Sequence, residues 1–100
     1  MEKLLIIYPP QPDAEAFKSY YEATHFPLVK TMPGLRRASY SFEVAVLAGE
    51  WDRFCIFEAE FDDRDALFAA LQSTEGQKVA ADTPNFAQVP ATILHYRMTE

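Results

Sequence analysis

Two adjacent runs of alternating side chains constrain the fold of this chain most strongly. Residues 35–47 and 51–61 each repeat side chains of similar character at every second position. Because side chains point to opposite faces along a β-strand, each run predicts a strand. Only Ala48-Gly49-Glu50 separates the two runs, and this short sequence is typical of a turn. The two runs therefore predict an antiparallel hairpin.

Each end of the chain predicts one further strand. Residues 3–8 form a short apolar run that stops at Pro9-Pro10, which is typical of a strand covered on both faces. Residues 91–98 alternate again. These two strands would join the central hairpin in one sheet.

The first helix is predicted to begin after Asp13, a preferred N-cap residue, and to extend to about Ala23. Pro27 cannot donate a backbone hydrogen bond and crowds the preceding turn. We therefore predict a break near His25, followed by a second short helical turn over 27–32. Such a break would aim the histidine ring into a cleft.

The second helical region is predicted to begin at Asp62 and to continue through Leu71. A capping-box match at Thr74 opens another short helix to about Ala81, and 82–90 is a predicted loop. The order is β-α-β-β-α-β, the ferredoxin-like α+β arrangement, within one domain of residues 1–100. Its sheet is antiparallel, and the helices cover one face.

The composition suggests what covers the other face of the sheet. Hydrophobic residues make up 49% of the chain and aromatic residues 14%, which is more apolar surface than a small two-layer domain hides. The hypothesis is a homodimer in which two open sheet faces pack together.

Charge and cysteine content exclude several classes of partner. The formal net charge is -6, and the nine Lys and Arg residues are scattered, which argues against nucleic acid and anionic membrane surfaces. No apolar run is long enough for a membrane span, and the N-terminus shows no signal-peptide pattern. The single cysteine, Cys55, cannot form an internal disulfide, which predicts a cytoplasmic protein. No metal-ligand spacing is present, so no metal or cofactor is predicted.

His25 is the main catalytic candidate. Its ordinary pKa near ~6.5 suits a general acid or base, while the alternative is a ring that only caps the helical turn. Tyr21 lies four residues earlier, where its hydroxyl would approach the ring, although Tyr20 and Tyr21 also fit a purely structural role. His95, in the last predicted strand, is interpreted as a structural histidine.

Further candidates for substrate binding are mostly aromatic. Trp51 and Phe57 would line an apolar pocket, as would Tyr40, but a tryptophan in a hairpin is also typical of a subunit interface. Asp82 and Asn85 flank Pro84 in the predicted loop. They would either reach the mouth of the cleft or form an Asx turn.

Two motifs resemble the EthD family. The segment YYEATHFPLVKTMPGLRR carries Tyr-Tyr, His-x-Pro-Leu and Pro-Gly-Leu, and LQSTEGQKVAADTPNFA carries Ser-x-Glu-Gly, Ala-Asp and Asn-Phe, in the order typical of that family. The resemblance implies a dimeric α/β barrel with His25 at the cleft of each subunit. Tyr21, Asp82 and Asn85 also match motif positions.

The resemblance leaves several functions open, since fold relatives include cofactor-independent monooxygenases, lactone isomerases and haem-degrading enzymes. The first hypothesis is an oxidoreductase or isomerase in which His25 moves a proton on a small apolar or aromatic substrate. The second is a binding protein for a hydrophobic molecule such as haem, with His25 or His95 as axial ligand. A third is an accessory protein of a degradation pathway.

Overall fold

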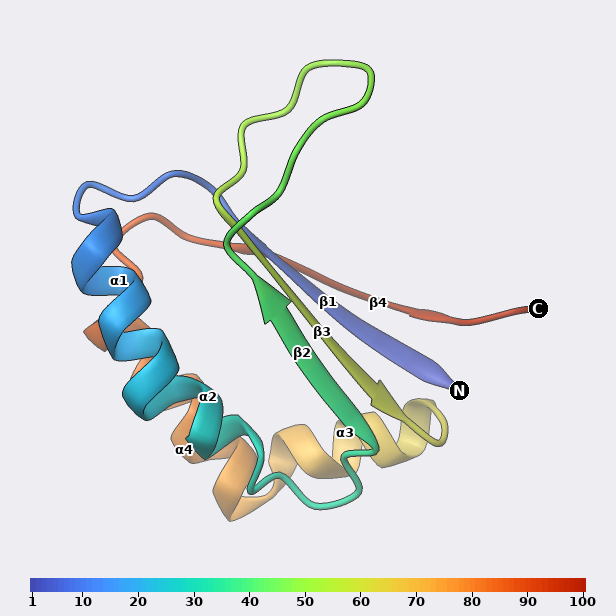
Figure 1. The fold of residues 1–100 in the computed structure, drawn as a ribbon. Coiled ribbons are helices and arrows are strands. Elements are labelled where there is room, and N and C mark those ends of the chain that lie inside the picture. The colour runs from blue at the N-terminus through green and yellow to red at the C-terminus, as the bar shows by residue number, and fades with distance from the viewer.

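The computed structural model describes residues 1–100 and has the predicted ferredoxin-like α+β fold (Figure 1). Its elements are β1 (Glu2–Tyr8), α1 (Ala14–Tyr20), the π-helical turn η1 (Tyr21–His25), α2 (Phe26–Val29), β2 (Arg37–Ser41), β3 (Cys55–Phe61), α3 (Arg64–Gln72), α4 (Thr74–Asp82), the 3₁₀ turn η2 (Thr83–Asn85) and β4 (Thr92–Arg97). The four strands pair antiparallel in the order β2-β3-β1-β4. All helices lie on one face of the sheet (Figure 1).

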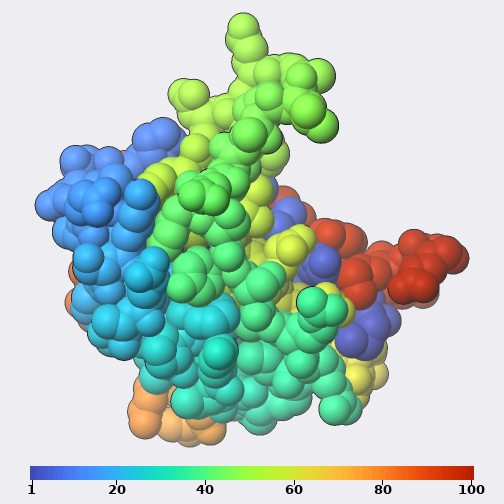
Figure 2. Space-filling view, viewed as in Figure 1, coloured from blue at the N-terminus to red at the C-terminus, as the bar shows by residue number.

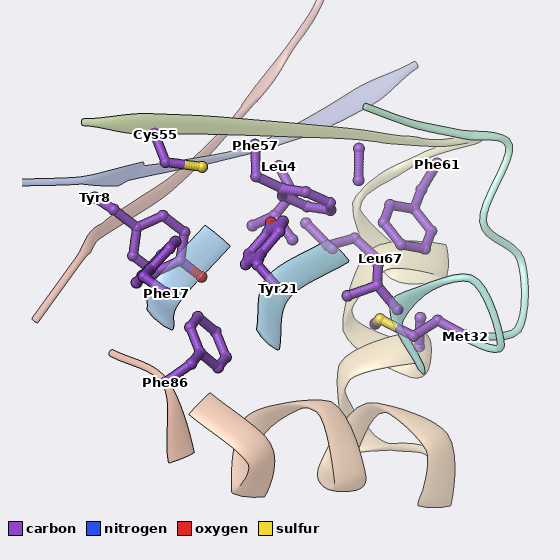
Figure 3. Close-up of a cluster of buried hydrophobic side chains, with 13 residues drawn as sticks. Leu4, Tyr8, Phe17, Tyr21, Met32, Cys55, Phe57, Phe61, Leu67 and Phe86 are labelled. Carbon is purple, nitrogen blue, oxygen red and sulfur yellow. The ribbon is translucent and has the colours of Figure 1, made fainter. Parts of the chain in front are cut away.

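The alternation predicted for β3 is confirmed by its burial. Its odd-numbered residues, from Cys55 to Phe61, are buried under the helices, while the residues between them are only partly buried. The register continues this face into β1, where Tyr8 is opposite Cys55 and Leu4 is opposite Ala59. Figure 3 shows the side chains of Leu4, Tyr8, Cys55, Phe57 and Phe61 pointing from the sheet toward the helices. The core therefore lies between the sheet and the helical layer.

The predicted helix break near His25 is wrong, because the chain continues from α1 through η1 into α2. Within η1 the backbone N–H of Phe26 donates to the carbonyl of Tyr21, five residues back. This wider turn holds one extra residue, and such π-helical turns occur where the normal four-residue ladder is disturbed. Here it accommodates Pro27, which has no N–H and would crowd the carbonyl four residues before it. The helix bulges around the proline, and does not end there.

The hairpin is shorter than predicted, because β2 ends at Ser41 and β3 begins at Cys55. Residues 42–54 form an extended connection, here called the arm, which projects beyond the sheet (Figures 1 and 2). Phe42 and Phe54 still pack on Phe17 of α1, but the side chains of residues 45–52 are exposed, and Leu47 is fully so. At the base of the arm, the rings of Phe42 and Phe54 stack at 5.6 Å. Alternation alone does not maintain a strand without a layer to pack on.

Capping fixes the start of each C-terminal helix. Asp63 caps α3, where Asp62 was predicted, by accepting from the backbone N–H of Ala66. Asp62 instead accepts two hydrogen bonds from Arg36, at 2.8 and 2.7 Å. Ser73 caps α4 in the same way as Asp63 caps α3. No helix has the length and apolar character that crossing a membrane requires.

Close packing of α3 and α4 depends on Gly76. A Cβ atom at this position would lie 2.1 Å from the backbone carbonyl oxygen of Ala70. The absent side chain lets the first turn of α4 rest directly on the end of α3. This contact fixes α4, and with it Asp82 at its C-terminal end.

Candidate active site

A cavity of about 340 Å³ lies between the helix-facing side of the sheet and the helices. Fifteen of its nineteen lining residues are hydrophobic, so it favours an apolar ligand. The lining comprises Leu4, Ile6, Tyr8, Tyr21, His25, Val29, Met32, Leu35, Phe57, Ala59, Phe61, Leu71, Gly76, Val79, Ala80, Thr83, Pro90, Ala91 and Ile93. Its volume is near the lower end of the roughly 300–1,000 Å³ typical of ligand pockets.

His25 is the one histidine in this lining, and the residue is only 3% exposed. The π-helical turn places its ring among aromatic side chains, with ring centroids 4.3 Å from Phe86 and 5.3 Å from Tyr21. Nδ1 of His25 lies 2.9 Å from Oδ2 of Asp82. The ring is therefore held by packing on its faces and by a carboxylate at one edge.

The Asp82 carboxylate is itself held by two further donors. Its Oδ1 accepts from the hydroxyl of Tyr20 at 2.5 Å and from Nδ2 of Asn85 at 3.0 Å. Burial favours the neutral acid, but the hydrogen bonds from Tyr20, Asn85 and His25 outweigh it and lower the pKa of Asp82. Asp82 is therefore ionised at neutral pH, as an acceptor with a fixed orientation.

His25 is neutral at the same pH. Burial lowers its pKa below the ordinary value, and this effect exceeds the opposing influence of the hydrogen bond and charge of Asp82. A carboxylate can only accept, so Nδ1 carries the proton and donates it to Asp82. The other ring nitrogen, Nε2, then has a free lone pair.

The free nitrogen faces the cavity. Every buried side-chain nitrogen and oxygen atom in the structure has a hydrogen-bond partner. The only hydrogen bond of the His25 ring is the one at Nδ1, so Nε2 is not among the buried atoms. Because the residue lines the cavity and is otherwise enclosed, Nε2 opens into that space. A neutral base directed into an apolar cavity can accept a proton from a bound molecule.

The structure brings some of the predicted site residues together and separates others. Tyr21 and Phe57 line the cavity, and Asp82 and Asn85 form the hydrogen-bonded layer behind His25. Tyr40 is outside the lining, with its ring edge against Tyr21 at 5.1 Å. Trp51 is on the exposed arm, where the guanidinium of Arg53 lies over its ring.

Sequence reasoning did not assign Tyr8, Tyr20 or Thr83 to the site. Tyr20 was recognised only as a core aromatic, yet its hydroxyl reaches Asp82, 62 residues away. No local pattern signals such a long-range contact. Tyr8 was visible only as the last residue before Pro9, and the register of β1 with β3 is what turns it toward the helices.

Fold and site together define a class: a ferredoxin-like α+β protein with an apolar cavity between helices and sheet, and a histidine–aspartate pair in its wall. Within that class, residues 9–90 match the model of the EthD domain, so the chain belongs to the EthD family. The resemblance noted from the two motifs is thereby confirmed.

Two similar proteins cover nearly the whole chain. The crystal structure of an ethyl tert-butyl ether d (EthD) family protein from Bacillus halodurans has 30% sequence identity and a TM-score of 0.89, over 99% of each chain. An uncharacterized 11.0 kDa protein of the thcB-thcC intergenic region of Rhodococcus erythropolis is 29% identical over 94 residues, which is 94% of this chain and 91% of that protein.

A more distant structure shares the fold. SnoaB from Streptomyces nogalater, a cofactor-independent oxygenase, has 14% identity and a TM-score of 0.68, over 99% of this chain and 93% of that one. At this identity the likeness establishes the common architecture alone.

Proposed function

We propose that the protein is an enzyme that removes a proton from a small apolar or aromatic substrate, with His25 as the general base. The observation that carries the proposal is the neutral imidazole whose free Nε2 opens into an apolar cavity. Oxidation by dioxygen or isomerisation can both begin with this step. The cofactor-independent oxygenase among the fold relatives is in keeping with such chemistry.

The proton moves along a short path. A C–H or O–H bond of the substrate breaks, the proton passes to Nε2, and the bonding electrons remain on the substrate. The ring becomes an imidazolium that Asp82 stabilises through the Nδ1 hydrogen bond, as Tyr20 and Asn85 hold the carboxylate in place. The apolar walls exclude water, which strengthens this interaction. The step uses only side chains of the protein.

Isotope exchange tests the step without knowledge of the natural substrate. The bicyclic ketone 2-tetralone carries exchangeable C–H groups and is small enough for the cavity. Wild-type protein in D₂O should accelerate deuterium incorporation, followed by proton NMR, and His25→Asn should reduce that acceleration by roughly 10²–10⁴-fold. Equal acceleration by the two proteins contradicts the proposal.

The apolar cavity also supports a second candidate, a carrier for a hydrophobic molecule that performs no chemistry. In that case 2-tetralone would bind without exchange, and His25→Asn would leave its affinity unchanged. The haem version of this candidate is tested by adding haem. A Soret band that is lost in His25→Asn supports haem binding with His25 as the axial ligand. The absence of a Soret band in wild-type protein excludes haem binding.

We further propose that the protein functions as a cytoplasmic homodimer. The sheet face opposite the helices carries a group of partly or wholly exposed apolar side chains, Leu5, Ile56 and Leu94 among them, and β4 is an exposed edge strand. Packing two such faces together would bury them. The free thiol of Cys55 is in keeping with a reducing compartment. Sedimentation should give twice the chain mass, and a single-chain mass at micromolar concentration contradicts the dimer.

A further inference from the structure

Two tyrosine hydroxyls are unpaired at the wall of the candidate active site. Tyr8 and Tyr21 line the cavity and are only 2% and 1% exposed. Neither hydroxyl forms a hydrogen bond with the protein, yet no fully buried side-chain oxygen lacks a partner. Both oxygen atoms are therefore open, and the cavity is the space that these enclosed residues share.

The two rings and His25 form a continuous group. The ring centroid of Tyr21 lies 6.0 Å from that of Tyr8 and 5.3 Å from that of His25. Figure 3 shows the hydroxyl oxygens of both tyrosines turned into the space between the sheet and the helices. Tyr8 comes from β1 and Tyr21 from η1, so the two hydroxyls reach this space from opposite walls.

Both hydroxyls remain protonated at neutral pH. Burial raises the pKa of Tyr8 and of Tyr21, and for Tyr21 the neighbouring hydroxyl of Tyr8 and the thiol of Cys55 raise it further. Each is therefore a hydrogen-bond donor without an acceptor. A cavity wall that only had to be apolar would carry phenylalanine here, as it does at Phe57. An unpaired polar group in such a wall costs free energy unless a ligand satisfies it.

We propose that Tyr8 and Tyr21 donate hydrogen bonds to an oxygen anion of the substrate, which makes the substrate a phenol or an enolisable ketone with one or two rings. This inference rests on the proposed function, in which His25 accepts the proton. When that O–H or C–H bond breaks, the electron pair settles on the substrate oxygen as phenolate or enolate. Two hydroxyl donors in a water-poor cavity stabilise this charge, and the small cavity limits the skeleton to about one or two rings.

A pair of matched probes isolates the hydroxyls. The compound 4-nitrophenol presents a phenolate oxygen and reports its ionisation by visible absorbance, while 4-nitrotoluene has a similar shape without that oxygen. Tyr8→Phe and Tyr21→Phe should each weaken binding of the phenolate about tenfold or more, because hydrogen bonds to charged groups are strong. Binding of 4-nitrotoluene should change little. Tyr96→Phe, on the exposed strand β4, is the control with full phenolate binding.

Two outcomes overturn the inference: equal phenolate affinity in wild type and both variants, or an equal loss for both probes, which marks the tyrosines as shape-determining only. A measurement on wild-type protein covers the case in which a variant does not fold. Two downfield hydroxyl proton resonances should appear with 4-nitrophenolate and not with 4-nitrotoluene, and their absence contradicts the assignment.

The isotope-exchange assay with His25→Asn tests the proposed function independently of the tyrosine variants. If His25 is the base, His25→Asn strongly reduces the acceleration of 2-tetralone exchange, whether or not the tyrosines bind the substrate oxygen. If exchange depends on His25 but phenolate affinity is unchanged in both tyrosine variants, His25 is the base and the tyrosines do not bind the oxygen anion. If the tyrosines hold phenolate while exchange is independent of His25, the proposed base is wrong.

Discussion

The chain contains two histidines, and each has its Nδ1 atom against a buried carboxylate. His25 lies 2.9 Å from Asp82, and His95 lies 2.6 Å from Glu2. The surroundings differ. The side chain of His95 is 37% exposed on the edge strand β4, and Glu2 accepts no other side-chain hydrogen bond. A histidine–carboxylate pair thus occurs once in the wall of an apolar cavity and once at the rim of the sheet.

The difference shows that a histidine–carboxylate pair acquires catalytic potential from its environment. At His25, burial keeps the ring neutral, and two extra donors from Tyr20 and Asn85 orient the carboxylate. At His95 the ring meets the edge of Phe68 on one side and solvent on the other. That site lacks an enclosed space in which a substrate would be held away from water.

Replacing each histidine in turn should give the largest contrast. His25→Asn should lower the rate of 2-tetralone exchange by roughly 10²–10⁴-fold, because the general base is lost. His95→Asn should leave the rate close to that of wild type. The rates are compared by proton NMR at one pH, with circular dichroism to verify folding. A large loss in His95→Asn would show that the wrong pair has been assigned.

Removing the negative charge from each carboxylate should give a smaller contrast. Asp82→Asn takes away a hydrogen bond to the charged imidazolium worth about 1.5–3 kcal/mol, which corresponds to about 10- to 100-fold in exchange rate. It also permits the wrong ring tautomer, since an amide can donate to Nδ1. Glu2→Gln, the matched variant at the other pair, should keep the wild-type rate. Full activity in Asp82→Asn contradicts an orienting role for Asp82.

Loss of the Tyr20 hydroxyl, which donates to the Asp82 carboxylate, should lower the exchange rate modestly and raise the pKa of His25. Without the hydroxyl of Tyr20, the Asp82 carboxylate is a stronger acceptor and stabilises the imidazolium more, so the pKa of His25 rises in Tyr20→Phe. The exchange rate should fall only a few-fold, while the acidic limb of its pH profile moves to higher pH. A simple drop in rate with an unmoved limb indicates a structural role alone.

The dependence of stability on pH should show the smallest effect. The folded-state pKa of His25 is lowered, so the unfolded chain binds the proton more readily. The free energy of unfolding should therefore fall as pH drops below about 6.5, the ordinary histidine value. The lowered pKa of Asp82 adds a second loss at more acid pH. Urea unfolding checks this, and His25→Asn should flatten the first decline. If His25→Asn shows the same decline in the free energy of unfolding as wild type, the decline arises from other titratable groups.

The sequence predicts much of the fold because local periodicity reports burial. The alternation from Cys55 to Phe61 predicts that strand and its covered face, because a sheet covered by helices on one face buries every second side chain. The same alternation failed beyond Ser41, because only the base of the arm packs on α1, through Phe42 and Phe54, and residues 45–52 are exposed. Periodicity shows which face of a strand is suited to burial. Whether a helix lies over that face depends on the tertiary structure.

The candidate site was only partly predictable. His25 stood out because Pro27 follows it, although the proline produces a π-helical turn and not a break. Asp82 was a candidate from its position beside Pro84 and from the family motif. Its partner Tyr20 was not predicted, because that hydrogen bond joins α1 to the end of α4. Contacts of this kind arise from packing between helices, which no short segment encodes.

The proposed proton transfer requires a neutral His25 with its proton on Nδ1 and a free Nε2. Nitrogen NMR of protein labelled with ¹⁵N-histidine measures this directly, and the His95→Asn variant leaves a single histidine to assign. Across a pH titration we expect an Nδ1–H tautomer at neutral pH and a pKa of His25 below the ordinary value near 6.5. An Nε2–H tautomer, or a ring that is already charged at neutral pH, would contradict the assignment of His25 as the base.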